Sequence, residues 1–585
     1  MRSLFLFFFF LSLYLSTLAP SVTGGDSGEL ITVAAKLGLA HPPGYPLYTL
    51  LGHFMTLIPL GTVAERLNFF SALCTAGACL LLNLSLEKIF KTWLVALPIS
   101  LAFGISPLVW KFSTEAEVFA LNSLLVASLL YWWVSNMEPG NNRKSWLLFG
   151  TLLGLSLSHH HTAVFVILPL SIWAFFCSKN RLQMLTLTGA GLVVGLSCYL
   201  YLPWVMSEPS NLRVLWANWQ GAVPHILRTA YGSFQLGVTN QNPGFDFVAR
   251  IFNFITSSFT QTSGLIIFLP FGLWQCWQKK YRWLFPFAIS LFFYILVFSA
   301  LANLSLTDPL AQATEERFWI LAYLLSFVII AIGISQFLAY FPNSKMRYLF
   351  CGSMIFVLGL RAAIHFHSQN QRTNTVVYDY AKTILGAVPP NAVLITSGDM
   401  TVHALLYLQE VEDFRTDVHL IPHYFLGQQW YLQNFGRIQP GVSLKLKEDG
   451  SGNFHFSLMS FAKDQMDIGL RVFTVNLPEP ILHDIKTELD IWPQAFTEEL
   501  KIPGTAIEIN EWRQRVDFSV DRFPIKNWSG HDHHLGAWEM EIFKMYSASL
   551  IRTANHIKSL PPNVQQPETL RQRAKELEDL AGASH

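Results

Sequence analysis

The sequence predicts a polytopic α-helical membrane protein with a small soluble α/β domain after its last apolar run. Of the 585 residues, 51% are hydrophobic and 14% are charged, whereas soluble domains usually carry about 25% charged residues. Apolar runs of about 17–25 residues, the length that crosses a bilayer, recur up to residue 365. Charged residues return from about residue 372. The net charge of +1 gives no electrostatic reason to expect a nucleic-acid partner.

Hydropathy and basic loops together define a membrane part, residues 1–365. Short loops rich in Lys and Arg mark the cytosolic side, so the spans must alternate between such loops, and a long outer loop follows at residues 206–262. We expect the first run to be a retained helix rather than a cleaved signal peptide. About eleven spans result, at residues 4–20, 66–88, 93–110, 118–136, 146–158, 162–178, 183–205, 264–279, 283–302, 318–340 and 347–365.

The first outer loop, residues 24–60, contains a further apolar run that we do not count as a span. Counting residues 45–60 would move Lys88 and Lys91 to the wrong side of the membrane. We expect this run to form an interfacial helix, paired with a helix that begins at Asp26. Acidic residues and histidines then cluster on the non-cytosolic side, which indicates a site that opens to a lumen or periplasm.

The acidic segment Gly24–Leu30, directly after the first apolar run, contains the main catalytic candidates, Asp26 and Glu29. Carboxylates at a bilayer edge are costly and indicate a functional role. An ionised carboxylate such as that of Asp26 can accept a proton from a hydroxyl nucleophile, and Glu29 shares its face if the segment is helical. The structural alternative is that Asp26 caps a helix and Glu29 interacts with the helix dipole.

Four residues are candidates for binding a donor phosphate. Arg317 offers a planar fork of donors suited to phosphate, although an ion pair with a neighbouring acid is an alternative role. His160 and His161 could bind a phosphate or a sugar hydroxyl. His41 begins the segment His-Pro-Pro-Gly-Tyr-Pro, which cannot be helical and predicts a rigid turn; the histidine could bind phosphate or belong only to that turn.

Four further residues are candidates for binding substrate. Glu117 and Asn122 lie in a segment that opens a span on the outer side, where an acid could also serve only the helix dipole. Tyr45 belongs to the proline-rich turn. Tyr231 lies in the long outer loop and could line a groove for an acceptor.

Other functional motifs are absent from the sequence. It has no Walker loop, no dinucleotide fingerprint after a strand and no nucleophile elbow with a hydrolase triad. The six cysteines all lie in apolar runs, and no Cys/His metal spacing occurs. Consecutive histidines, residues 159–161, point in different directions, so a zinc site would need ligands from elsewhere. We expect no cofactor and no divalent metal.

The C-terminal part, residues 372–585, reads as a soluble domain on the lumenal or periplasmic side. Residues 393–396 and 417–421 resemble buried strands, and residues 401–408 between them resemble a helix, which predicts one β-turn-α-β unit. The tail at residues 536–582 is predicted to be helical.

At these motifs the chain resembles a GT-C-type family of protein O-mannosyltransferases, formerly known as a membrane domain of unknown function. The animal member of this family modifies IPT domains of plexins and hepatocyte growth factor receptor-type receptors. The resemblance covers about residues 20–340 and rests on motifs in the same order, Gly25–Leu30, Ala40–Leu47, Ala116–Asn122, Gly154–Ser158, His161–Thr162, Tyr231–Phe234 and Glu316–Trp319.

The resemblance implies a GT-C membrane fold and sugar transfer from a polyprenyl-phosphate donor, with Asp26 in the position of the base. We therefore expect inverting transfer of a sugar, mannose by resemblance, from dolichyl phosphate to Ser or Thr hydroxyls of an acceptor protein. The membrane would be the endoplasmic reticulum in a eukaryote or the inner membrane in a bacterium. The alternative is a transporter or flippase of lipid-linked sugars, which would need a polar path across the membrane; the predicted spans contain almost no charge at mid-membrane.

Overall fold

The chain folds into two compact units, which we call the membrane unit and the C-terminal unit. The computed structural model describes residues 2–136, 143–207, 221–229, 232, 246–278, 280–445, 447–448, 454–455, 457–505, 508–523, 536–559 and 575. The membrane unit contains residues 1–20, 39–207 and 222–373. The C-terminal unit joins residues 21–38 to residues 374–585. The acidic segment with Asp26 therefore belongs to the C-terminal unit.

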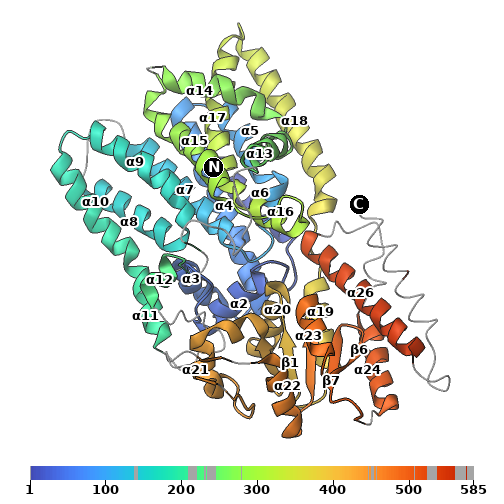
Figure 1. Ribbon diagram of the computed structural model, residues 1–585. Coiled ribbons are helices and arrows are strands. Elements are labelled where there is room, and N and C mark those ends of the chain that lie inside the picture. Colours follow the sequence, from blue (N-terminus) through green and yellow to red (C-terminus); the bar gives the residue numbers. More distant parts are fainter. Residues whose placement is uncertain are drawn as a thin grey trace. The chain divides into compact units, whose positions relative to one another are not determined.

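The membrane unit is helical (Figure 1), and each of the eleven predicted apolar runs coincides with a helix or a helix pair. Apolar segments become helices in lipid because a helix satisfies its own backbone hydrogen bonds. The helices are α1 (Arg2–Leu15), α3 (Pro46–Thr56), α4 (Val63–Phe90), α5 (Trp93–Gly104), α6 (Pro107–Lys111), α7 (Val118–Asn136), α8 (Arg143–His159), α9 (Val164–Cys177), α10 (Arg181–Leu196), α11 (Tyr201–Met206), α12 (Ala222–Ile226), α13 (Phe247–Gln261), α14 (Leu269–Trp277), α15 (Phe285–Leu301), α16 (Pro309–Glu316), α17 (Trp319–Ala339) and α18 (Ser344–Gln369).

Several of these helices are long enough to cross a membrane. Among the described residues, six segments qualify by length and composition. Four are the single helices α4, α7, α17 and α18. The other two are Arg181–Met206, which contains α10 and α11, and Arg282–Leu301, which contains α15. Helices α13 and α14, bent by 110° at their junction, make a seventh if they form one span. Helices α1, α5 and α9 are apolar but shorter. The chain is a multi-pass membrane protein, and the expected number of about eleven spans stays a prediction.

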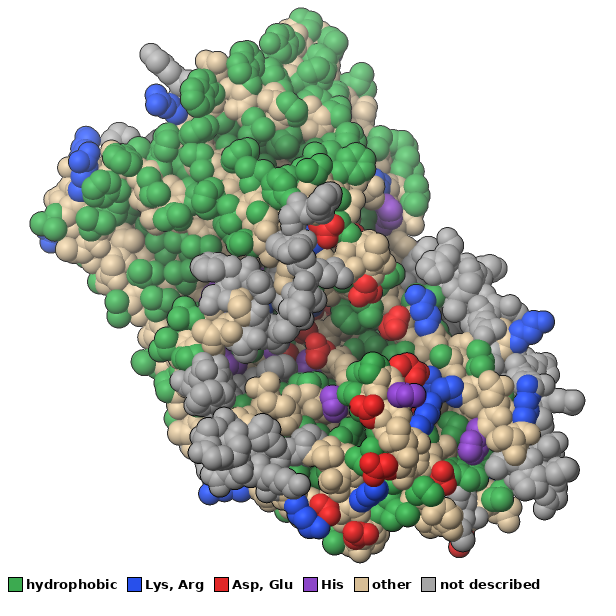
Figure 2. All heavy atoms as spheres, viewed as in Figure 1, with side chains coloured by type: hydrophobic (Ala, Val, Ile, Leu, Met, Phe, Trp, Pro, Cys, Tyr) green, Lys and Arg blue, Asp and Glu red, His purple; other side chains and the backbone are tan. Residues whose placement is uncertain are grey.

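The face of the membrane unit seen in Figure 2 is apolar, as a lipid-facing surface must be. In Figure 2 hydrophobic side chains cover its helices with few charges between them. Helix α18 exposes large apolar side chains such as Leu349 and Phe356, whereas α17 is apolar all round and almost wholly buried. A helix that is hydrophobic on every side and buried forms the core of such a bundle.

Helices α8 and α10 pack with their backbones in direct contact. Gly150 and Gly154 on α8 meet Gly191 and Gly195 on α10. A Cβ on Gly150 would overlap the carbonyl oxygen of Thr188, and one on Gly191 would overlap a carbonyl oxygen of α8. Small residues four apart are the usual means by which membrane helices approach so closely.

The C-terminal unit is an α/β domain whose charged side chains gather on the surface seen in Figure 2. Its elements are α2 (Ser27–Lys36), α19 (Val376–Ala387), β1 (Val393–Thr396), α20 (Asp399–Glu410), β2 (His419–Pro422), α21 (Gln429–Ile438), β3 (Lys447–Glu448), β4 (Phe454–His455), α22 (Leu458–Asp467), β5 (Val472–Val475), α23 (Glu479–Lys486), β6 (Asp490–Gln494), β7 (Thr497–Lys501), α24 (Ile509–Arg522) and α26 (Ala537–Ser559).

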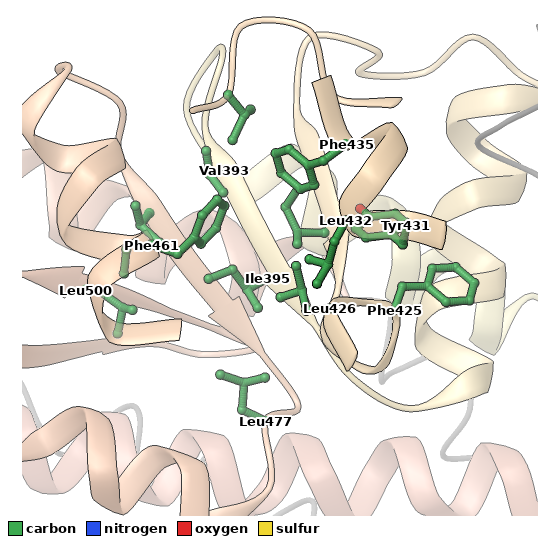
Figure 3. Close-up of a cluster of buried hydrophobic side chains, with 14 of the residues drawn as sticks. Val393, Ile395, Phe425, Leu426, Tyr431, Leu432, Phe435, Phe461, Leu477 and Leu500 are labelled. Atoms are coloured by element: carbon green, nitrogen blue, oxygen red, sulfur yellow. The ribbon is translucent and has the colours of Figure 1, made fainter. Parts of the chain in front are cut away.

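The predicted β-turn-α-β unit is confirmed as β1, α20 and β2. It forms part of a five-stranded sheet with the order β2-β1-β5-β7-β6, in which β1 pairs parallel with β2 and β5, and β7 pairs antiparallel with β5 and β6. Apolar side chains of β1, α21 and α22 pack on one another beside this sheet (Figure 3). Both Val393 and Ile395 are fully buried, which explains the continuous apolar run of this strand.

Candidate active site

Arg317 and Glu117, two candidates far apart in the sequence, form an ion pair in the membrane unit. Nη1 of Arg317 donates to Oε1 of Glu117 at 2.8 Å, and the two side chains are 11% and 3% exposed. The backbone N–H of Val118 donates to the other carboxylate oxygen at 3.2 Å. The sequence suggested that an ion pair of Arg317 would involve a neighbouring acid, but the acid in this pair comes from the start of α7.

Two aromatic rings lie beside the guanidinium of this ion pair. The guanidinium carbon of Arg317 lies 5.7 Å from the ring centre of Phe119 and 6.0 Å from that of Phe318, within the range of cation–π attraction. The ring of His160 lies 5.6 Å from Phe119 and 5.8 Å from Phe318. Arg317 and His160 therefore contact the same two aromatic rings.

The proline-rich turn adds two more candidates to this cluster. The ring of Tyr45 stacks on His160 with the centroids 5.9 Å apart, and Nε2 of His41 lies 3.3 Å from the Tyr45 hydroxyl. Tyr45 has a φ of +41°, which ordinary residues rarely adopt. The turn thus places the ring of Tyr45 against that of His160. The fold brings His41, Tyr45, His160, Glu117 and Arg317 into one chain of contacts.

The positive charge of this cluster comes from Arg317 rather than from His160. Burial lowers the pKa of His160 well below its usual range, and the charges of Arg228 and Arg317 lower it further, as do the neighbouring histidines. His160 is therefore neutral at pH 7 and can serve as a hydrogen-bonding group. Its Nδ1 lies 2.7 Å from the Thr162 hydroxyl.

The three consecutive histidines have different partners, as expected for adjacent residues. Nε2 of His159 lies 2.8 Å from the carbonyl oxygen of Val118, whereas Nε2 of His161 lies 3.2 Å from the Tyr199 hydroxyl. Asn122 is buried inside α7. Tyr231, the fourth substrate-binding candidate, lies outside the described residues.

Asp26 and Glu29 open helix α2 in the C-terminal unit. Asp26 occupies the N-cap position, but its side chain makes no capping hydrogen bond, so the structural alternative does not account for its carboxylate. Glu29 lies in the first turn and is 5% exposed. Ligand atoms of Asp26, Glu29 and His403 all lie within 4.8 Å of one another. His403 comes from α20, which packs against α2.

Two residues of interest were not predicted from the sequence, His403 and Arg250. Arg250 lies on α13, within the predicted outer loop, and its fully buried guanidinium pairs with Glu315 and donates to the carbonyl oxygen of Leu304. The amphipathic spacing of residues 247–261 is the signal that could have identified this helix. No local signal connects His403 with Asp26.

Comparison with solved structures defines the class of this protein. It resembles the crystal structure of ArnT from Cupriavidus metallidurans bound to undecaprenyl phosphate, with a TM-score of 0.53 and 12% identity over 86% of this chain and 97% of that chain. At this identity the likeness concerns the fold alone. The chain has the GT-C fold of membrane glycosyltransferases, as the sequence predicted.

Comparison with sequences then gives the family. Residues 26–184 match the model of the protein O-mannosyl-transferase TMEM260 N-terminal domain, and residues 377–441 match TMEM260-associated domain 2. The chain is 30% identical to protein O-mannosyl-transferase TMEM260 of Mus musculus, over 94% of this chain and 81% of that protein. It is 27% identical to the Dictyostelium discoideum protein of that name, over 72% and 56% respectively. The chain belongs to the TMEM260 family of protein O-mannosyl-transferases and is a glycosyltransferase.

Proposed function

We propose that this glycosyltransferase moves a mannosyl residue from a polyprenyl-phosphate donor to a Ser or Thr hydroxyl of an acceptor protein, on the lumenal or periplasmic face of its membrane. Membership of an O-mannosyl-transferase family supports the sugar and the protein acceptor. The lipid phosphate bound to the similar ArnT structure supports a lipid-linked donor. In a eukaryotic host the donor would be dolichyl phosphate mannose. The transporter alternative has no support in a family named for a transferase.

The proposed reaction is a single displacement with inversion at the anomeric carbon. The acceptor hydroxyl oxygen attacks that carbon while Asp26 takes the hydroxyl proton as general base. The bond between the anomeric carbon and the phosphate oxygen breaks, and its electron pair leaves with the lipid phosphate. Arg317 stabilises the charge that develops there, since a positioned cation acts most strongly where charge appears in the transition state.

The observation that carries this proposal is the buried ion pair of Arg317 and Glu117. Holding a guanidinium in a site with little water costs desolvation energy, which Glu117 offsets. The pair and the rings of Phe119 and Phe318 together fix one cation in place before a donor arrives. A cation held in place in this way suits the donor phosphate, which must be bound before the reaction and released after it.

The remaining candidates take supporting roles in this proposal. Neutral His160, with His41 and His161, would hydrogen-bond phosphate or sugar hydroxyls. Tyr45 contacts both His41 and His160 and would bind the sugar. Asn122 and Tyr231 are also proposed to bind substrate.

The test is transfer by the purified full chain in lipid nanodiscs, with dolichyl or undecaprenyl phosphate mannose and a Ser/Thr-containing acceptor domain. Mass spectrometry of the acceptor should show an added hexose on Ser or Thr. Replacing Arg317 by Gln should lower the turnover about 10²–10³-fold, the usual effect of removing one charge-stabilising donor. Arg143→Gln, at an exposed arginine of α8, is the control and should retain full turnover. Absence of hexose with both donors would refute the proposed reaction, and full turnover of Arg317→Gln would refute the role of Arg317.

A further inference from the structure

His403 is a buried histidine whose ring nitrogens lack a hydrogen-bond partner in the described part of the chain. Its side chain is 4% exposed, and neither Nδ1 nor Nε2 has a hydrogen-bond partner among the described residues. A neutral imidazole has one N–H donor and one lone-pair acceptor, and buried groups of this kind are nearly always satisfied. An unsatisfied buried imidazole indicates a ligand that completes the site.

Two carboxylates lie next to this histidine. Oxygen atoms of Asp26 and Glu29 and a ring nitrogen of His403 are all within 4.8 Å of one another. Glu29 is as deeply buried as His403, while Asp26 is partly exposed. The three side chains therefore form a cluster in which only Asp26 is partly exposed to solvent.

The backbone determines this arrangement. Helices α2 and α20 approach so closely at Gly28 that a Cβ there would lie 2.7 Å from the carbonyl oxygen of His403. Only glycine fits this contact, and it lies between the two carboxylate residues in the sequence. The position of Asp26 and Glu29 over α20 thus follows from main-chain packing and not from flexible side chains.

We propose that Asp26, Glu29 and His403 bind a divalent metal ion, of which Zn²⁺ and Mn²⁺ are the best matches. Imidazole nitrogen and carboxylate oxygen are ligands that these ions share. The ion would give His403 a partner that the described residues do not provide, and would neutralise two carboxylates at the buried start of a helix. A metal was not expected from the sequence because the third ligand comes from α20, far along the chain.

Three protein ligands leave coordination positions open, as in catalytic metal sites. If the proposed transfer is correct, on which this step alone rests, an acceptor hydroxyl would occupy one open position, where the ion polarises its O–H bond. Asp26 would bind the ion through one oxygen and accept the hydroxyl proton with the other. The metal site itself does not depend on this step.

The test is metal binding by the full chain, purified in detergent through a tag without histidine. The protein is stripped with chelator, equilibrated with Zn²⁺ or Mn²⁺, desalted and analysed by inductively coupled plasma mass spectrometry. We expect about one tightly bound ion per chain, as for a site preformed by folding. Co²⁺ in place of Zn²⁺ should give visible d–d absorption that depends on His403.

Matched variants locate the site. His403→Ala and the nearly isosteric Glu29→Gln should each lower bound metal at least tenfold, whereas His423→Ala, at a half-buried histidine outside the cluster, should leave it unchanged. His403→Ala removes a ring, whereas Glu29→Gln hardly changes the side-chain volume, so a loss of metal in both variants does not come from a packing defect alone. Gel filtration and thermal unfolding would detect misfolding of either variant. Failure of the wild-type chain to bind either ion stoichiometrically, or full binding by folded Glu29→Gln, overturns the metal site.

The same preparations separate this inference from the proposed function. A wild-type chain that binds neither ion stoichiometrically but carries out transfer that needs Asp26 refutes the metal site and leaves the transferase proposal standing. Stoichiometric metal that is lost in His403→Ala, together with transfer that is unchanged in Asp26→Asn, supports the metal site and refutes Asp26 as the general base.

Discussion

The ion pair of Arg317 and Glu117 gives a quantitative prediction. At the observed 2.8 Å the attraction between unit charges is about 6 kcal/mol with an effective dielectric constant of about 20, before desolvation is subtracted. Removing one partner of such a buried pair usually costs about 3–5 kcal/mol, because the other charge is left uncompensated. Replacing both partners by uncharged residues avoids that cost.

We therefore expect Glu117→Gln and Arg317→Met each to destabilise the folded membrane unit, and the double variant to be more stable than the sum of the two losses predicts. The coupling should be at least 1–2 kcal/mol, within the range seen for contacting residues. Steric-trapping or SDS-unfolding measurements in bicelles give the required free energies for all four proteins. Losses that simply add, within about 0.5 kcal/mol, would show that the two side chains do not interact as described.

Three further outcomes follow from the fold. Gly191→Leu should separate α8 from α10 and lower the unfolding temperature by several degrees, whereas Gly189→Leu, where an added Cβ meets nothing within 4 Å, should have little effect. Burial raises the pKa of Glu316 above its ordinary value of 4.5, so the folded state loses stability as the pH rises through the raised pKa. Glu316→Gln should thus raise the unfolding temperature at pH 8 but not at pH 4, and an equal gain at both would contradict this. Arg250→Met should destabilise the chain by leaving Glu315 buried without that partner, and Arg250→Met with Glu315→Leu should recover most of the loss, as measured by thermal unfolding.

Local features of this protein were predictable because they depend on neighbours in the sequence. Each apolar run became a helix, since a backbone in lipid has no other way to satisfy its hydrogen bonds. The strand at Val393 and the helix after it could be predicted from a short apolar run and a turn that contains glycine. The proline-rich turn at Tyr45 followed from the fixed φ of proline.

Contacts between distant segments were not predictable from one sequence. The partner of Arg317 could have been any acid on the outer side, and its identity as Glu117 depends on how α7 packs against α17. Glycine is common in membrane helices, so the glycines of α8 and α10 do not by themselves identify a contact. Their spacing of four indicates close packing but not which helix is the partner. His403 reaches Asp26 because α2 packs on α20, a contact that residue patterns do not encode locally.

The most direct test of the central claim is the turnover of Asp26→Asn. Single-turnover transfer at saturating polyprenyl-phosphate mannose should fall about 10²–10⁴-fold, the usual contribution of a positioned general base, while donor binding changes little. Asp413→Asn, at an exposed acid of the same unit, should transfer at the wild-type rate. Wild-type turnover by a folded Asp26→Asn protein would contradict the account.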